Sequence, residues 1–171
     1  MTVRANKPAF SIREKLKELD YSHVPYEKMP AGSVIQVVEG FSTSQVESSY
    51  SSETSLGLSA SISPKFFNSK ILVMVKLTGC GSRSTSTVWM TILKRDSTSL
   101  ASFSGYSGYQ GLSGAEAYPS GMYLDSPNTT SSITYAMYGL RTAGTSNCYA
   151  MHSNGLNPNQ RATIVLMEIS Q

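Results

Sequence analysis

The sequence predicts an all-β protein, an antiparallel β-sandwich of jelly-roll-like form preceded by a short helical N-terminal arm. Three observations support this prediction. Serine and threonine are abundant, with 30 Ser and 14 Thr among 171 residues, and their side chains compete with helical hydrogen bonds. Apolar and polar residues alternate from about residue 33 onward, which is the period of half-buried strands. Ten of the 25 charged residues lie in the first thirty positions.

The first thirty residues are predicted to form an arm that contains one helix. Ser11 and Glu14 have the spacing of a capping box. Three apolar residues then recur at i, i+4 and i+7 on one helical stripe: Ile12, Leu16 and Leu19. A helix of about eight residues is unstable alone in water, so we expect it to pack on a partner or, alternatively, over the edge of its own sandwich. A turn-prone stretch at 29–32 separates the arm, 1–30, from the β domain, 31–171.

The β domain carries five segments whose alternation predicts strands: 56–62, 71–77, 88–93, 133–138 and 162–169. Weaker signals predict further strands at 33–39, 45–51, 98–103, 121–125 and 147–152. The segment 71–77 has apolar residues on both faces and is therefore expected to be central. About eight to ten short strands with frequent turn signals are typical of a sandwich or barrel.

Several predicted strands carry more apolar side chains than one sandwich core can absorb. The residues expected on outer faces are Leu72, Met74, Trp89, Tyr138, Val165 and Met167. Soluble monomers rarely expose a patch of this size. The sequence therefore predicts an obligate oligomer.

The residues that usually carry catalysis or bind metals are scattered. The two histidines, His23 and His152, lie in different regions, and His152 is about 13 Å from Cys148 along a predicted strand. No Gly-x-Ser-x-Gly nucleophile motif is present. The carboxylates considered as glycosidase pairs are interpreted instead as solvated surface charges: Glu39, Glu47, Glu53, Glu116 and Asp125. We predict no enzyme activity, catalytic residue, metal or cofactor.

Charge and apolar content also limit the partners. The net charge is +3, and no basic stripe indicates binding to nucleic acid. No apolar run approaches the roughly 20 residues of a membrane-spanning helix, and the N-terminus lacks the pattern of a signal peptide. The two cysteines, Cys80 and Cys148, are expected to be free thiols in a chain assembled in a cytoplasm.

One segment has the composition of an adaptable binding loop. Glycine occurs at every third position from Gly105 to Gly114, and seven of ten tyrosines lie between residues 106 and 149. Tyrosine beside serine and glycine supplies rigid contact area at small entropic cost. Tyr106, Tyr109 and Tyr118 are therefore candidates for stacking on sugars. The alternative interpretation is a structural loop or a contact between subunits.

Several stretches of the β domain resemble one family of structural proteins from tailed bacteriophages, especially marine phages, that are described as fibre-like or virion structural proteins. The resembling stretches are 29–36 (MPAGSVIQ), 69–75 (SKILVMV), 123–127 (YLDSP), 132–135 (SITY) and 162–169 (ATIVLMEI). Residues 7–16 (KPAFSIREKL) resemble the N-terminal arms of such proteins.

This resemblance implies a β-sandwich, often a homotrimer, that is exposed on a virion and attached through its N-terminus. The implied partners are other virion proteins of the capsid or tail, which the arm would contact through its apolar stripe. The chain reaches its globular domain after about thirty residues, without the shaft of a typical tail fibre. We therefore expect a head decoration, a short capsid fibre or a small tail component, assembled in the host cytoplasm.

Overall fold

The computed structural model describes residues 25–84, 86–103, 117–151 and 160–171, and this part of the chain is almost entirely β-structure. Its elements are η1 (Tyr26–Lys28), a 3-10 helix, and the strands β1 (Val34–Ser42), β2 (Val46–Ser48), β3 (Thr54–Ile62), β4 (Lys70–Lys76), β5 (Gly81–Ser82), β6 (Val88–Arg95), β7 (Thr98–Phe103), β8 (Ser120–Asp125), β9 (Ile133–Ala143), β10 (Cys148–Ala150) and β11 (Ala162–Ile169). The predicted all-β class is confirmed. The predicted arm helix lies outside the described residues.

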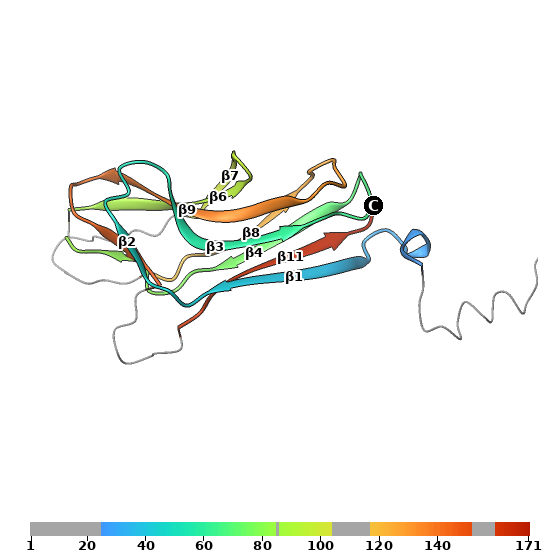
Figure 1. Cartoon of the computed structure of the whole chain (residues 1–171), viewed down its shortest axis with the longest axis horizontal. Helices are drawn as coiled ribbons and strands as arrows, with labels where there is room; N and C mark the ends of the chain where they lie inside the picture. The colour runs from blue at the N-terminus through green and yellow to red at the C-terminus, as the bar shows by residue number, and fades with distance from the viewer. Residues whose placement is uncertain (1–24, 85, 104–116, 152–159) are drawn as a thin grey trace, which may run out of the picture.

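Two four-stranded sheets form the layers of a sandwich (Figure 1). Sheet I has the order β1-β11-β4-β8, and sheet II has the order β3-β9-β6-β7. The layers approach most closely where their edges meet. A Cβ atom on Gly40 would lie 2.0 Å from the carbonyl oxygen of Ser59, and one on Gly121 would lie 2.3 Å from the ring of Phe103. Glycine at these two positions therefore permits the contact of β1 with β3 and of β8 with β7.

The strand order follows from folding one long antiparallel ribbon in half and rolling it up. The ribbon pairs β1 with β11, β3 with β9, β4 with β8, and β6 with β7. Rolling then places β11 beside β4 and β9 beside β6. This arrangement is the double-sheet jelly roll, so the predicted sandwich is confirmed.

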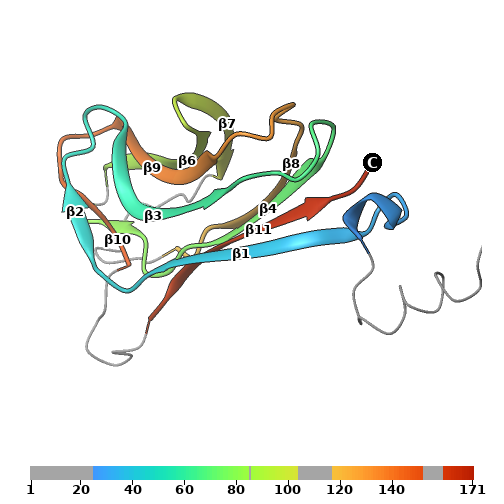
Figure 2. The ribbon, with the colours of Figure 1, turned by 45° about the vertical axis from the view of Figure 1, so that its right-hand side comes forward.

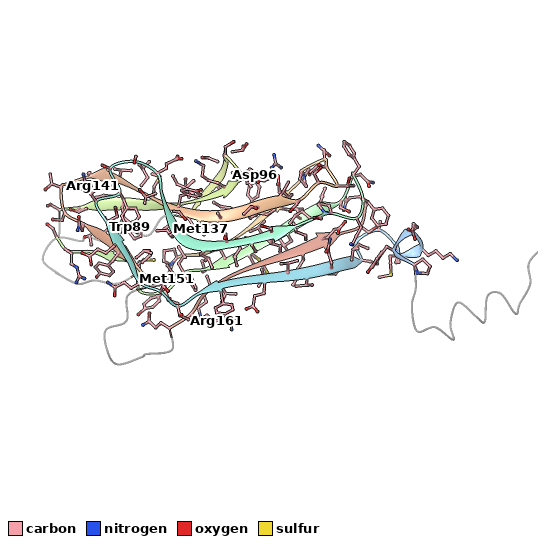
Figure 3. The ribbon with its side chains drawn as sticks, in the orientation of Figure 1. Trp89, Asp96, Met137, Arg141, Met151 and Arg161 are labelled. Carbon is pink, nitrogen blue, oxygen red and sulfur yellow. The ribbon has the colours of Figure 1, made fainter. Side chains whose placement is uncertain are left out.

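The ribbon reverses at the β6–β7 hairpin, whose tip is labelled at Asp96 in Figure 3. Asp96 has φ of 50°, a left-handed conformation that aspartate tolerates in turns. Its backbone N–H donates to the Thr134 carbonyl at 2.8 Å, and its Oδ1 accepts from the Thr134 N–H at 3.0 Å. These two bonds fix the turn against the beginning of β9.

Each of the ten predicted strand segments contains a strand in the structure. The predicted central strand is β4, which lies between β11 and β8. The sequence analysis missed β5, because a two-residue strand is too short to show a period. Both β1 and β9 extend beyond their predicted ends.

The inward residues of both sheets form one core (Figure 3). Trp89 was predicted on an outer face, and this prediction is wrong because the indole is only 3% exposed. The Trp89 and Tyr50 rings stack with centroids 5.3 Å apart. A Cβ atom on Gly139 would lie 2.9 Å from the indole. The missing side chain at Gly139 therefore provides the space that the tryptophan fills.

Glu168 is fully buried in β11, although its neighbours along the strand are apolar. Its Oε1 accepts the backbone N–H groups of Lys65 at 2.7 Å and Phe66 at 3.3 Å. The same oxygen accepts the Ser69 hydroxyl at 2.7 Å. Its Oε2 accepts the Gln36 side-chain amide at 2.6 Å. Because a buried charge requires such partners, Glu168 fixes the β3–β4 connection to sheet I.

Asp125 was predicted to be a solvated surface charge, and this prediction is also wrong because the residue is 6% exposed. Its Oδ2 accepts from Arg95 Nη1 and from the Tyr135 hydroxyl, each at 2.7 Å. Burial and the Asp125 carboxylate raise the pKa of Tyr135 above its ordinary value, so the phenol stays a donor. This cluster connects β8 of sheet I with β6 and β9 of sheet II.

We predict that Glu168→Gln lowers the free energy of unfolding by about 2 kcal/mol. The glutamine side chain would place its own N–H donors against the N–H and hydroxyl groups that donate to Glu168 in the wild type. The matched control is Glu39→Gln in the adjacent strand β1, since Glu39 forms a half-exposed ion pair with Arg161. The control should change stability by less than about 1 kcal/mol. Urea unfolding followed by circular dichroism measures both, and equal losses in the two variants would contradict the proposed role of Glu168.

Candidate assembly surfaces

The described residues do not bring the predicted polar groups together into one reactive cluster. No group of three or more His, Cys, Asp or Glu in the described part of the chain could hold a metal ion. Three of the predicted carboxylates instead form surface ion pairs: Glu39 with Arg161, Glu47 with Arg83, and Glu53 with Lys94. Glu116 and His152 lie outside the described residues. In the same part of the chain, no helix is long and apolar enough to cross a membrane.

The outer face of sheet I carries two adjacent rows of side chains that run across all four strands and are apolar except at Glu39. One row consists of Val37, Met167, Leu72 and Leu124, which are neighbours in register on β1, β11, β4 and β8. The next row consists of Glu39, Val165, Met74 and Met122. We call the seven apolar residues of these rows the apolar face. Met122 is 70% exposed, Val37 55% and Leu124 50%.

Charged side chains lie at the margins of the apolar face. Lys70 and Lys76 occupy the two ends of β4. Beyond the second row, Phe41 is 59% exposed on β1, and the Arg161 guanidinium lies 4.1 Å from its ring centroid. Arg161 also pairs with Glu39. An uncharged centre with charges at its edge is the composition of a protein contact.

The outer face of sheet II is polar at its β3 edge but apolar at its centre, where Met90 and Ile92 of β6 pair with Leu140 and Tyr138 of β9. Its β3 edge exposes Ser55, Ser59 and Ser61, and the Ser61 and Thr134 hydroxyls are 2.8 Å apart. Tyr138 lies on this face, half-buried, with the Lys94 ammonium 4.9 Å from its ring centroid. The apolar side chains at the centre of this face are buried or half-buried, whereas Val37, Met122 and Leu124 on the outer face of sheet I are exposed.

The six residues that the sequence analysis placed on outer faces lie in three different parts of the sandwich. Leu72, Met74, Val165 and Met167 lie together on the outer face of sheet I, where each is half-buried. Tyr138 lies on the opposite face, and Trp89 is in the core. The sequence analysis missed Val37, Met122 and Leu124, which join the apolar face only through strand register.

The arm enters the sandwich beside the C-terminus, as Figure 2 shows for η1 and the end of β11. The Gly32 N–H donates to the Ser170 carbonyl at 2.8 Å, and the Ser170 N–H donates to the Ser33 carbonyl at 2.9 Å. A shallow hollow of about 230 Å³ lies here; its lining residues are Tyr26, Glu27, Met29, Phe66, Asn68, Ser170 and Gln171. We call this the arm end. The predicted anchoring residues Ile12, Leu16 and Leu19 lie outside the described residues.

A small sheet of order β2-β10-β5 lies at the opposite end of the sandwich (Figure 1). Its strands come from the β1–β3, β9–β11 and β4–β6 connections. A bridge between Cys80 and Ala117 adds the β7–β8 connection to this end, which we call the loop end. Tyr118, beside that bridge, is 55% exposed. Tyr106 and Tyr109 lie outside the described residues.

The two cysteine thiols are buried at the loop end, Cys148 in β10 and Cys80 in the β4–β5 connection. Cys80 and Cys148 are 1% and 0% exposed, and neither forms a disulfide. Burial raises the pKa of the Cys148 thiol to about 11, and Arg141 opposes this shift. Burial, with the neighbouring Cys148 and Cys80 thiols, also raises the pKa of Tyr50. The Cys148 thiol therefore remains protonated and unreactive at neutral pH.

Comparison with known proteins found only remote similarity. No protein-family model matches the chain, and no curated protein matches it. Among solved structures, the VP2 subviral particle of infectious bursal disease virus aligns with a TM-score of 0.43 and 13% identity, over 81% of this chain and 38% of VP2. Dimeric latent PorU from Porphyromonas gingivalis aligns with a TM-score of 0.41 and 11% identity, over 82% of this chain and 14% of PorU. This chain thus spans well under half the length of either protein, and at these scores neither likeness assigns it a function.

We predict that stability falls as the pH rises above about 8.5. The unfolded Cys148 thiol ionises near that value, whereas the folded thiol keeps its proton to about pH 11. Between these values the unfolded state has lost a proton that the folded state retains, so it is favoured. Raising the pH from 7.5 to 9.5 should cost the wild type about 1 kcal/mol more than Cys148→Ala. Urea unfolding with reductant present measures the difference, and parallel pH profiles would contradict the prediction.

Proposed function

We propose that this protein is a non-enzymatic structural component of a virus particle, attached by its N-terminal arm and exposing the loop end of its jelly roll. A head decoration, a short capsid fibre and a small tail component all fit this proposal. The observation that carries it is the placement of the arm end and the loop end at opposite ends of the sandwich. The resemblance of the strand sequences to phage structural proteins supports the same role.

The geometry of the arm end supports attachment there. The backbone bonds between Gly32, Ser33 and Ser170 hold the chain to the end of sheet I. Whatever the arm contacts is thereby coupled directly to β1 and β11, the two strands that close the roll. A load applied through the arm would act along β1, where eight residues pair with β11. Such a connection suits a protein held on a surface by one end.

A second candidate function is recognition of a host surface glycan at the loop end. The observation that favours it is the 55% exposed ring of Tyr118, which lies at the end opposite the arm. An exposed aromatic ring can stack on the apolar face of a sugar. This function is compatible with a structural role, because the arm and the loop end are separate surfaces.

We predict that Leu16→Asp reduces incorporation into particles without changing the thermal midpoint of the β domain. The substitution places a charge in the apolar stripe through which the arm would dock. The matched control is Lys17→Asp, which introduces the same side chain next to the stripe and should be incorporated normally. Quantifying the protein in purified particles tests this, and equal incorporation of both variants would exclude docking through the stripe.

We also predict that Tyr118→Ala, in the full chain, weakens any glycan binding on an array by roughly fivefold or more, while leaving particle incorporation intact. The phenol ring would supply the stacking surface, and its loss typically costs about 1 kcal/mol or more. Tyr26→Ala at the arm end, where the ring is 37% exposed, is the matched control. A wild-type protein that binds no glycan on the array would remove the second candidate.

A further inference from the structure

We propose that the apolar face of sheet I is covered by the same face of a second copy of this chain. This inference rests on the proposed structural function, in which many copies assemble on one particle, and it names the partner. The surface consists of Val37, Leu72, Met74, Met122, Leu124, Val165 and Met167. The contact is isologous, so each subunit contributes the same residues.

The size of the apolar face suits a contact between subunits. Four strands at a spacing of about 4.8 Å span roughly 19 Å, and a strand of seven residues is roughly 23 Å long, so the sheet face measures roughly 400 Å² in projection. The largest apolar patch of an ordinary monomer is about 300–600 Å² and is often functional. A stable interface removes about 800 Å² of accessible surface from each partner. The pleated face and its rim, which includes Phe41, provide an area of this order.

The shape and composition of the face favour another sheet as the occupant. Two sheets pack face to face by interdigitating the alternate side chains of each pleat. Three of the seven residues are methionines, whose unbranched chains adapt to an opposing surface. The charges of Lys70, Lys76 and Arg161 lie at the margin, so they can remain in water when two apolar centres meet.

The chain's own arm is too small to cover this surface. The predicted stripe from Ile12 to Leu19 is about 10 Å long on a helix and one side chain wide. It could cover one of the two rows, which lie about 7 Å apart along the strands. The second row, with Met122 at 70% exposure, would stay in water. A second sheet face covers both rows at once.

The test uses the full-length chain and light scattering or sedimentation at micromolar concentration. The wild type should have twice the mass of one chain. Met122→Asp should weaken the dimer on the order of 100-fold, because it would bury a charge at the contact. Ser59→Asp, at the exposed serine-rich β3 edge of sheet II, is the matched control and should remain dimeric. Because Met122 is so exposed in the single chain, Met122→Asp should fold normally, which circular dichroism and the thermal midpoint check.

Each alternative outcome is distinct. A wild type that stays monomeric overturns the inference, as does a dimer that withstands both Met122→Asp and Met74→Asp. A dimer lost in Leu16→Asp but kept in Met122→Asp would assign the contact to the arm and also overturn it. Dimerisation is measured on the purified protein and incorporation on particles. The protein could therefore form a dimer that depends on Met122 and yet never enter particles. That result would support the proposed contact and contradict the proposed structural function.

Discussion

The pairing of β1 with β11 is the constraint on which the rest of the structure depends. It joins residues near opposite ends of the chain and closes the roll. A slip of one residue would turn every side chain of β11 to the other face. Hydrophobicity alone barely opposes that slip, because Ile164 and Leu166 face inward while Val165 and Met167 face outward.

Glu168 resolves this ambiguity. In the observed register its carboxylate accepts the N–H groups of Lys65 and Phe66 and the Ser69 hydroxyl. In a slipped register the carboxylate would gain water, but the buried Ser69 hydroxyl would be left without this acceptor, at a cost of about 1–3 kcal/mol. A single buried charge can therefore specify which apolar side of β11 enters the core. The other side is then committed to the outer surface, where it forms the apolar face.

The sequence predicted the strands well because alternation is a local property. It failed where the environment of a residue is set by distant strands. Trp89 stands in a strand that is apolar on both faces, and only Tyr50 and Gly139 show which face is inside. Asp125 is buried because Arg95 and Tyr135 reach it from the other sheet. Strand order, and with it the joining of Val37 to Leu124 in one row, depends on register that no short stretch of sequence contains.

The three candidate surfaces occupy different parts of the jelly roll. The apolar face lies on the broad side of sheet I, whereas the arm end and the loop end lie at opposite ends of the sandwich. A contact between two broad sides blocks neither end, so a paired assembly keeps two arms and two loop ends available. Substitutions at distant sites without shared partners have nearly additive effects. Leu16→Asp should therefore leave association through Met122 unchanged. Loss of the dimer should nevertheless weaken attachment, because a pair of arms binds a particle more tightly than one when the second contact forms at high effective concentration.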